Sequence, residues 1–135
     1  MIESHLKLIG IFLIVLALAH SVLPKYFNWA NELRQISLIS RQIMYIHTLF
    51  IALMLLLMGL LCLTATDELI KTKLGNQILL GLGIFWAIRL FVQFFGYSSM
   101  VWKGKRMESV IHVLASLLWV YLSTVFLFAF TMTFK

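Results

Sequence analysis

The sequence predicts an all-α integral membrane protein: a four-transmembrane-helix bundle with a short interfacial amphipathic helix between its first and second spanning helices. Hydrophobic residues make up 62% of the 135 residues and charged residues 12%, whereas soluble domains have about 45–50% apolar and about 25% charged residues. Four apolar segments are each long enough to cross a bilayer, which takes about 20 residues of helix. The length indicates a single transmembrane domain over residues 1–135.

The first apolar segment, residues 6–23, predicts a spanning helix that Pro24 ends, because proline removes a helical hydrogen bond and clashes with the preceding turn. In residues 25–41, Trp29 and Leu33 share one helical face, and most charged and amide side chains lie on the other. This pattern predicts a short amphipathic helix at the membrane surface, with an aromatic anchor. The alternative is a lid over a site beneath it.

Three further spans follow along the chain. They are expected at residues 42–64, 76–97 and 107–135. The third span contains Gly81 and Gly83, and small residues of this kind let membrane helices approach each other closely. The four spans together predict a bundle with both termini on one side of the membrane.

Basic residues in the loops predict the orientation. The side opposite the termini carries six of them: Lys25, Arg34, Arg41, Lys103, Lys105 and Arg106. The side of the termini carries four: Lys7, Lys71, Lys73 and Lys135. Because cytoplasmic loops are enriched in Lys and Arg, we expect both termini to face outward, in a bacterial inner membrane. The net charge of +6 then suits lipid headgroups, and no nucleic acid partner is expected.

Polar residues within the fourth span indicate which of its faces looks inward. Glu108, His112 and Ser116 are four residues apart and therefore lie on one face of a helix. Polar groups inside a bilayer are costly and usually face the interior of a bundle. The stripe therefore predicts a polar lining near the start of the fourth span.

Counting residues from the helix boundaries places several polar residues in one layer. His20, His47 and His112 lie four to six residues from the boundary residues Pro24, Arg41 and Arg106, which is about 6–9 Å at a rise of about 1.5 Å per residue. Gln93 joins this layer from the third span, and Arg89 lies one turn deeper. In the predicted orientation the layer is near the cytoplasmic face.

Two cofactors suit three histidines in one layer. The first is haem b held by two of them, with His47 and His112 as the preferred axial pair and Arg89 or the basic residues 103–106 on its propionates. The second is a single transition-metal ion bound by His20, His47 and His112, with an open coordination position. The sequence has no H-E-x-x-H, C-x-x-C or C-x-x-C-H motif to favour either.

An arginine within a span needs an acceptor for its charge. Glu108 is the one acidic residue at about the depth of Arg89. Because an unpaired charge in a bilayer costs several kcal/mol, about 2.5–3.5 on insertion scales, Arg89 is expected to pair with Glu108 or to bind an anionic ligand. Such a ligand would carry a propionate, a phosphate or a carboxylate.

Three function classes follow. The first is an oxidoreductase or haem-handling protein with its cofactor near the cytoplasmic face. The second is a metal-dependent membrane enzyme acting on a lipid-soluble substrate, and a quinone belongs to the same ligand class. The third is a non-catalytic accessory or structural subunit that contacts a partner subunit or a second copy of the chain. Whether the protein is an enzyme is left open by the sequence.

Overall fold

The computed structural model describes residues 1–97 and 104–133, and all regular secondary structure in this part is helical. Among the described residues, four helices are long and apolar enough to cross a membrane. The predicted fold class, an all-α bundle of four membrane-spanning helices, is therefore confirmed. Lys103 and Lys135, which entered the sequence-based expectations, lie outside the described residues.

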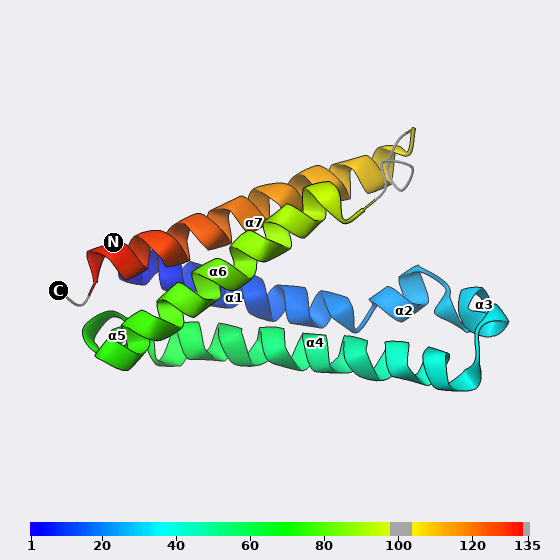
Figure 1. Cartoon of the computed structure of the whole chain (residues 1–135), viewed down its shortest axis with the longest axis horizontal. Helices are drawn as coiled ribbons and strands as arrows, with labels where there is room; N and C mark the ends of the chain where they lie inside the picture. The colour runs from blue at the N-terminus through cyan, green and yellow to red at the C-terminus, as the bar shows by residue number, and fades with distance from the viewer. Residues whose placement is uncertain (98–103, 134–135) are drawn as a thin grey trace. The chain divides into compact units, whose positions relative to one another are not determined.

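The described chain has four long helices and four short helical elements (Figure 1). The long helices are α1 (Ile2–His20), α4 (Leu38–Thr64), α6 (Lys73–Phe95) and α7 (Arg106–Met132). The short elements are α2 (Leu23–Tyr26), α3 (Trp29–Glu32), the 3₁₀ helix η1 (Leu33–Gln35) and α5 (Thr66–Lys71). With 27 residues each, α4 and α7 are about 40 Å long, which exceeds a hydrocarbon core of about 30 Å.

The segment between α1 and α4 is helical, as expected, but it is divided into three short pieces. The reason is Asn28, whose φ of 53° lies in the left-handed region and interrupts the helix between α2 and α3. Pro24 stands in the first turn of α2, where its missing N–H costs nothing. It therefore begins a helix, and α1 has already ended at His20.

The start of α4 lies four residues before the expected one, because a serine caps it. The Ser37 hydroxyl accepts a hydrogen bond from the Ser40 N–H at 3.3 Å, which satisfies one of the unpaired donors of the first turn. Trp29 of α3 meets Tyr45 of α4 edge to face, with 5.4 Å between ring centroids. This aromatic contact holds α3 against the beginning of α4.

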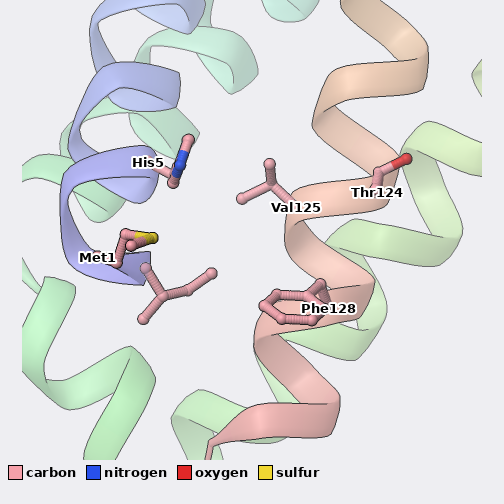
Figure 2. Close-up of a pocket in the computed structure, with 6 residues that line it drawn as sticks. Met1, His5, Thr124, Val125 and Phe128 are labelled. Carbon is pink, nitrogen blue, oxygen red and sulfur yellow. The ribbon is translucent and has the colours of Figure 1, made fainter.

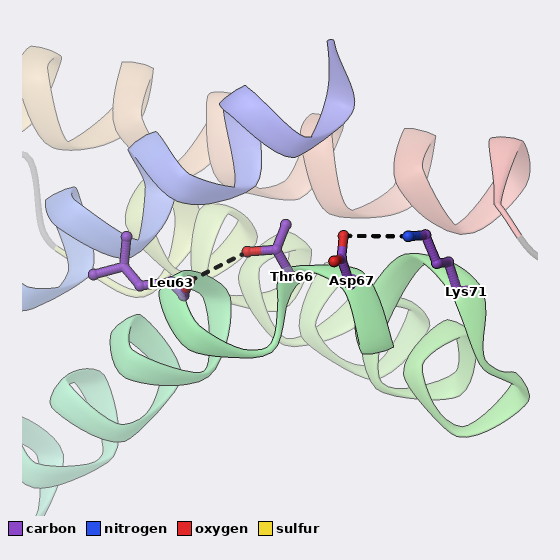
Figure 3. A network of polar contacts seen from close by, with 4 residues as sticks. All are labelled: Leu63, Thr66, Asp67 and Lys71. Atoms are coloured by element: carbon purple, nitrogen blue, oxygen red, sulfur yellow. Dashed lines mark hydrogen bonds and ion pairs between the residues drawn. The ribbon is translucent and has the colours of Figure 1, made fainter.

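The turn between α4 and α6 contains α5, where the sequence suggested only a polar loop (Figure 3). The Thr66 hydroxyl donates to the carbonyl oxygens of Cys62 at 2.6 Å and Leu63 at 3.4 Å. Lys71 pairs with Asp67 at 3.6 Å, but both side chains are exposed, so the pair contributes only about 0.3–0.5 kcal/mol. The hydroxyl of Thr72 then caps α6.

The described chain forms two compact units, residues 6–66 and residues 1–5 with 67–135. In the first unit, α1 and α4 approach closely at two glycines. A Cβ atom on Gly10 would lie 2.8 Å from the Gly59 carbonyl oxygen, and one on Gly59 would lie 2.8 Å from the Gly10 oxygen. Small residues at both positions are therefore required for this backbone contact.

In the second unit, α6 and α7 lie side by side along much of their length (Figure 1). Near the start of α6, the Asn76 amide donates to the carbonyl oxygens of Phe130 at 2.9 Å and Thr133 at 3.3 Å. These bonds satisfy carbonyls that the end of α7 leaves without helical partners. Gly83 faces Leu127 of α7, whereas a Cβ atom on Gly81 would meet nothing within 4 Å.

Replacing Gly83 by alanine is expected to destabilise the protein by about 1–3 kcal/mol, the usual cost of overpacking. The new Cβ atom would lie 2.5 Å from Leu127 Cδ2 and 3.2 Å from the Leu127 backbone nitrogen. Thermal unfolding in detergent measures the effect. Gly81→Ala is the matched control, and it should be neutral or stabilising by up to about 1 kcal/mol, because alanine favours helix. Equal losses in both variants would contradict the close approach at Gly83.

Candidate functional site

A buried amide makes three hydrogen bonds, one within α6 and two to α7. Gln93 of α6 is only 6% exposed. Its Oε1 atom accepts from Arg89 Nη1 at 3.1 Å and from Trp119 Nε1 at 3.2 Å. Its Nε2 atom lies 2.8 Å from His112 Nδ1. We call these four residues, Arg89, Gln93, His112 and Trp119, the Gln93 cluster.

Helical spacing explains how the sequence builds this cluster. Arg89 and Gln93 are four residues apart on α6, and His112 and Trp119 are seven apart on α7, so each pair lies on one helical face. Arg89 lies six residues before the end of α6, and His112 six residues after the start of α7. Both are therefore about 9 Å from the helix ends that face the same connection.

Arg89 is held by neutral groups. Its guanidinium carbon lies 5.0 Å from the centroid of the Trp119 ring and 5.8 Å from that of Tyr97, within the range of cation–π attraction. Across the described residues the one ion pair is Lys71–Asp67, so Arg89 is not paired with Glu108. The expected ion pair with Glu108 is therefore not formed, and the alternative, an anionic ligand at Arg89, stays a prediction.

Aromatic rings surround the cluster. Trp86 stacks on Trp119 with 5.0 Å between centroids and an interplanar angle of 16°, and Phe94 meets His112 edge-on at 6.1 Å. Trp86 is 2% exposed, and its indole N–H is buried without an acceptor among the described residues. The network therefore has aromatic neighbours, and the bond from Trp119 to Gln93 is buried among them.

The other predicted site residues have separate surroundings. His20 is half-buried, and its Nδ1 bonds the carbonyl oxygen of Leu16 at 2.8 Å. His47 is exposed. Both belong to the unit of residues 6–66, whereas His112 belongs to the other unit. The pairing of His47 with His112 as haem ligands therefore stays a prediction.

The structure offers no support for the alternative of a metal ion bound by all three histidines. Within residues 1–97 and 104–133, no group of three or more His, Cys, Asp or Glu side chains is placed to hold a metal ion. One residue of the predicted polar stripe on α7 makes its hydrogen bond within its own helix. Ser116 is buried and donates to the His112 carbonyl oxygen at 2.7 Å, a bond within its own helix, while Glu108 is half-buried.

Sequence reasoning missed two contacts. Trp119 was not among the predicted site residues, although its spacing of seven from His112 places both on one face. The second contact is that of His5, which is exposed and whose Nδ1 bonds the Tyr121 hydroxyl at 2.8 Å. Beside this bond, the first turn of α1 and the second half of α7 line an apolar cavity of about 180 Å³ (Figure 2).

Comparison of the chain with family models, with curated proteins and with solved structures finds no match in any of the three. The functional argument therefore depends on the geometry of the site itself.

Replacing Gln93 by alanine should destabilise the protein by about 1–3 kcal/mol, because it leaves the buried donors of Arg89 and Trp119 without their acceptor. Chemical denaturation in detergent is the measurement. Gln77 provides a matched control, because it is an exposed glutamine on the same helix. A loss for Gln77→Ala as large as that for Gln93→Ala would show that the network adds no stability.

Proposed function

We propose that this protein binds the anionic group of a lipid-soluble ligand at the Gln93 cluster, with Arg89 as the anion-binding residue. One observation carries the proposal: Arg89 lies within a helix apolar enough to span a membrane, and among the described residues it has no carboxylate partner. Ionisable residues inside membrane spans are rare and usually mark substrate or ion pathways.

The surroundings of Arg89 suit recognition of a planar anion. Its bond to Gln93 Oε1 occupies one nitrogen and orients the guanidinium, and the rings of Trp119 and Tyr97 lie beside it. A guanidinium has five N–H donors in a fixed plane, which match the two oxygens of a carboxylate or phosphate. The ligand class is thus an amphiphile with such a group, such as a fatty acid, a lipid phosphate or a haem propionate.

Arg89→Lys and Arg89→Gln test this proposal. We expect both variants to bind a fluorescent long-chain fatty acid about tenfold or more weakly than the natural protein, because a charge-assisted hydrogen bond contributes about 1.5–3 kcal/mol. Lysine should restore little of the fatty acid binding, since it lacks the planar guanidinium group. The measurement is a titration in detergent micelles, with the methyl ester of the same fatty acid as the uncharged ligand.

Lys73→Gln is the matched control, because it removes an exposed cation from the first turn of the same helix. It should leave fatty acid binding unchanged. Equal binding of acid and ester by the natural protein would overturn the proposal. If Arg89→Lys bound the fatty acid as tightly as the natural protein, Arg89 would act only through its positive charge near the headgroups. If Arg89→Gln lowered stability without altering binding, the accessory-subunit class would be favoured, with the cluster serving only to join α6 to α7.

Haem binding is the second candidate, and the surroundings of His20 favour it. The Leu16 carbonyl oxygen can only accept, so His20 Nδ1 donates to it and the ring lone pair is on Nε2. Metal-ligating histidines commonly have this arrangement. With His47 as a further ligand, the protein would belong to the redox or haem-handling class.

The haem candidate predicts an absorption band in protein purified from cells supplied with haem. Alanine at each axial ligand should abolish or strongly alter that band, whereas alanine at the remaining histidine of His20, His47 and His112 should leave it largely intact. Absorption spectra of the three variants identify the pair. Protein that stays colourless after haem is supplied would eliminate this candidate.

A further inference from the structure

The orientation of the Gln93 amide is determined by its neighbours. Its Oε1 atom lies 3.1 Å from Arg89 Nη1 and 3.2 Å from Trp119 Nε1. Guanidinium and indole nitrogens can only donate hydrogen bonds. The reversed amide would place an NH₂ group against both donors and lose both bonds. The Nε2 atom of Gln93 therefore faces His112 and donates to its Nδ1 at 2.8 Å.

This bond in turn determines the state of His112. A ring nitrogen that accepts a hydrogen bond carries its lone pair there, and the single proton of a neutral imidazole is then on the other nitrogen. A protonated ring would carry hydrogens on both nitrogens and would set an Nδ1–H group against the N–H of Gln93. The geometry thus places the proton of neutral His112 on Nε2.

We infer that Gln93 holds His112 as the neutral Nε2–H tautomer, so that His112 is a hydrogen-bond donor and not a ligand of a metal ion or haem iron. The ligand of the Gln93 cluster is then recognised through oxygen atoms, by the N–H groups of Arg89. This statement about ligand class rests on the proposed function, whereas the tautomer does not.

The cost of the opposite state explains why the tautomer is held. To offer a lone pair at Nε2, His112 would need its proton on Nδ1, and Gln93 would then have to turn its oxygen toward the ring. That rotation breaks the bonds from Arg89 and Trp119 to Oε1. The lone pair at Nδ1 is already occupied by Gln93. Gln93 is therefore a positioning residue for His112.

His20 provides an internal contrast. Its Nδ1 lies 2.8 Å from the Leu16 carbonyl oxygen, which has no hydrogen to donate, so the proton of neutral His20 is on Nδ1. The same chain thus holds two half-buried histidines in opposite tautomers. A measurement that resolves the signals of the two rings can therefore use His20 as the reference for His112.

Nitrogen NMR of the histidine rings tests the inference. Protein labelled with ¹⁵N-histidine in detergent micelles should show an unprotonated Nδ1 and a protonated Nε2 for His112, and the reverse for His20. His112→Asn and His20→Asn assign the signals. A protonated Nδ1 on His112 in the natural protein would overturn the inference directly.

Gln93→Glu provides the second measurement, because a carboxylate can only accept. It should place a proton on His112 Nδ1, seen as a large shift of that signal, while the His20 signals stay in place. An unchanged Nδ1 signal in this variant would contradict the positioning role of Gln93.

Two titrations separate this inference from the proposed function. Added Zn²⁺ should leave the ring nitrogens of His112 unshifted, and a shift assigned to binding there would overturn the inference. Added long-chain fatty acid should shift the Arg89 side-chain signals of ¹⁵N-arginine-labelled protein. If it does not, the proposed function fails while the tautomer result stands by itself.

Discussion

The buried side chain of Gln93 is the constraint on which the α6–α7 unit depends. A polar group inside a bilayer finds no water, so its hydrogen bonds have to be made within the protein. Gln93 meets this requirement with one bond inside α6, to Arg89, and two across to α7, to Trp119 and His112. These bonds fix the rotation of each helix about its own axis and, with it, the face that carries the candidate site.

Other contacts support the same arrangement of α7 against α6. Asn76 binds the carbonyl oxygens at the end of α7, and Gly83 allows α7 to approach α6 at Leu127. Between Gly83 and Gln93, Trp86 stacks on Trp119. The helices are thus joined by polar bonds near both ends and by close packing between them. Membrane helices associate through this combination, because lipid leaves little hydrophobic force to drive them together.

The histidines show why the residue type alone does not determine whether a side chain can bind a metal. His20 and His112 are both half-buried near the ends of long helices, and the sequence suggested the same role for both. A carbonyl oxygen faces Nδ1 of His20, whereas an amide N–H faces Nδ1 of His112. The lone pair of neutral His20 is therefore on Nε2, whereas that of neutral His112 is on Nδ1.

The sequence by itself determined the class of the protein, because long apolar segments have to be helical in lipid and their number can be counted. It also placed Arg89, Gln93 and His112 at similar depths, since helical rise is constant. The break at Asn28 could not be foreseen, because a left-handed residue depends on its surroundings. Only the tertiary structure decided that Arg89 lies beside Trp119 and Gln93 instead of Glu108. The neighbours of Arg89 depend on how α7 is rotated against α6. That rotation results from packing and hydrogen bonds between residues far apart in the chain.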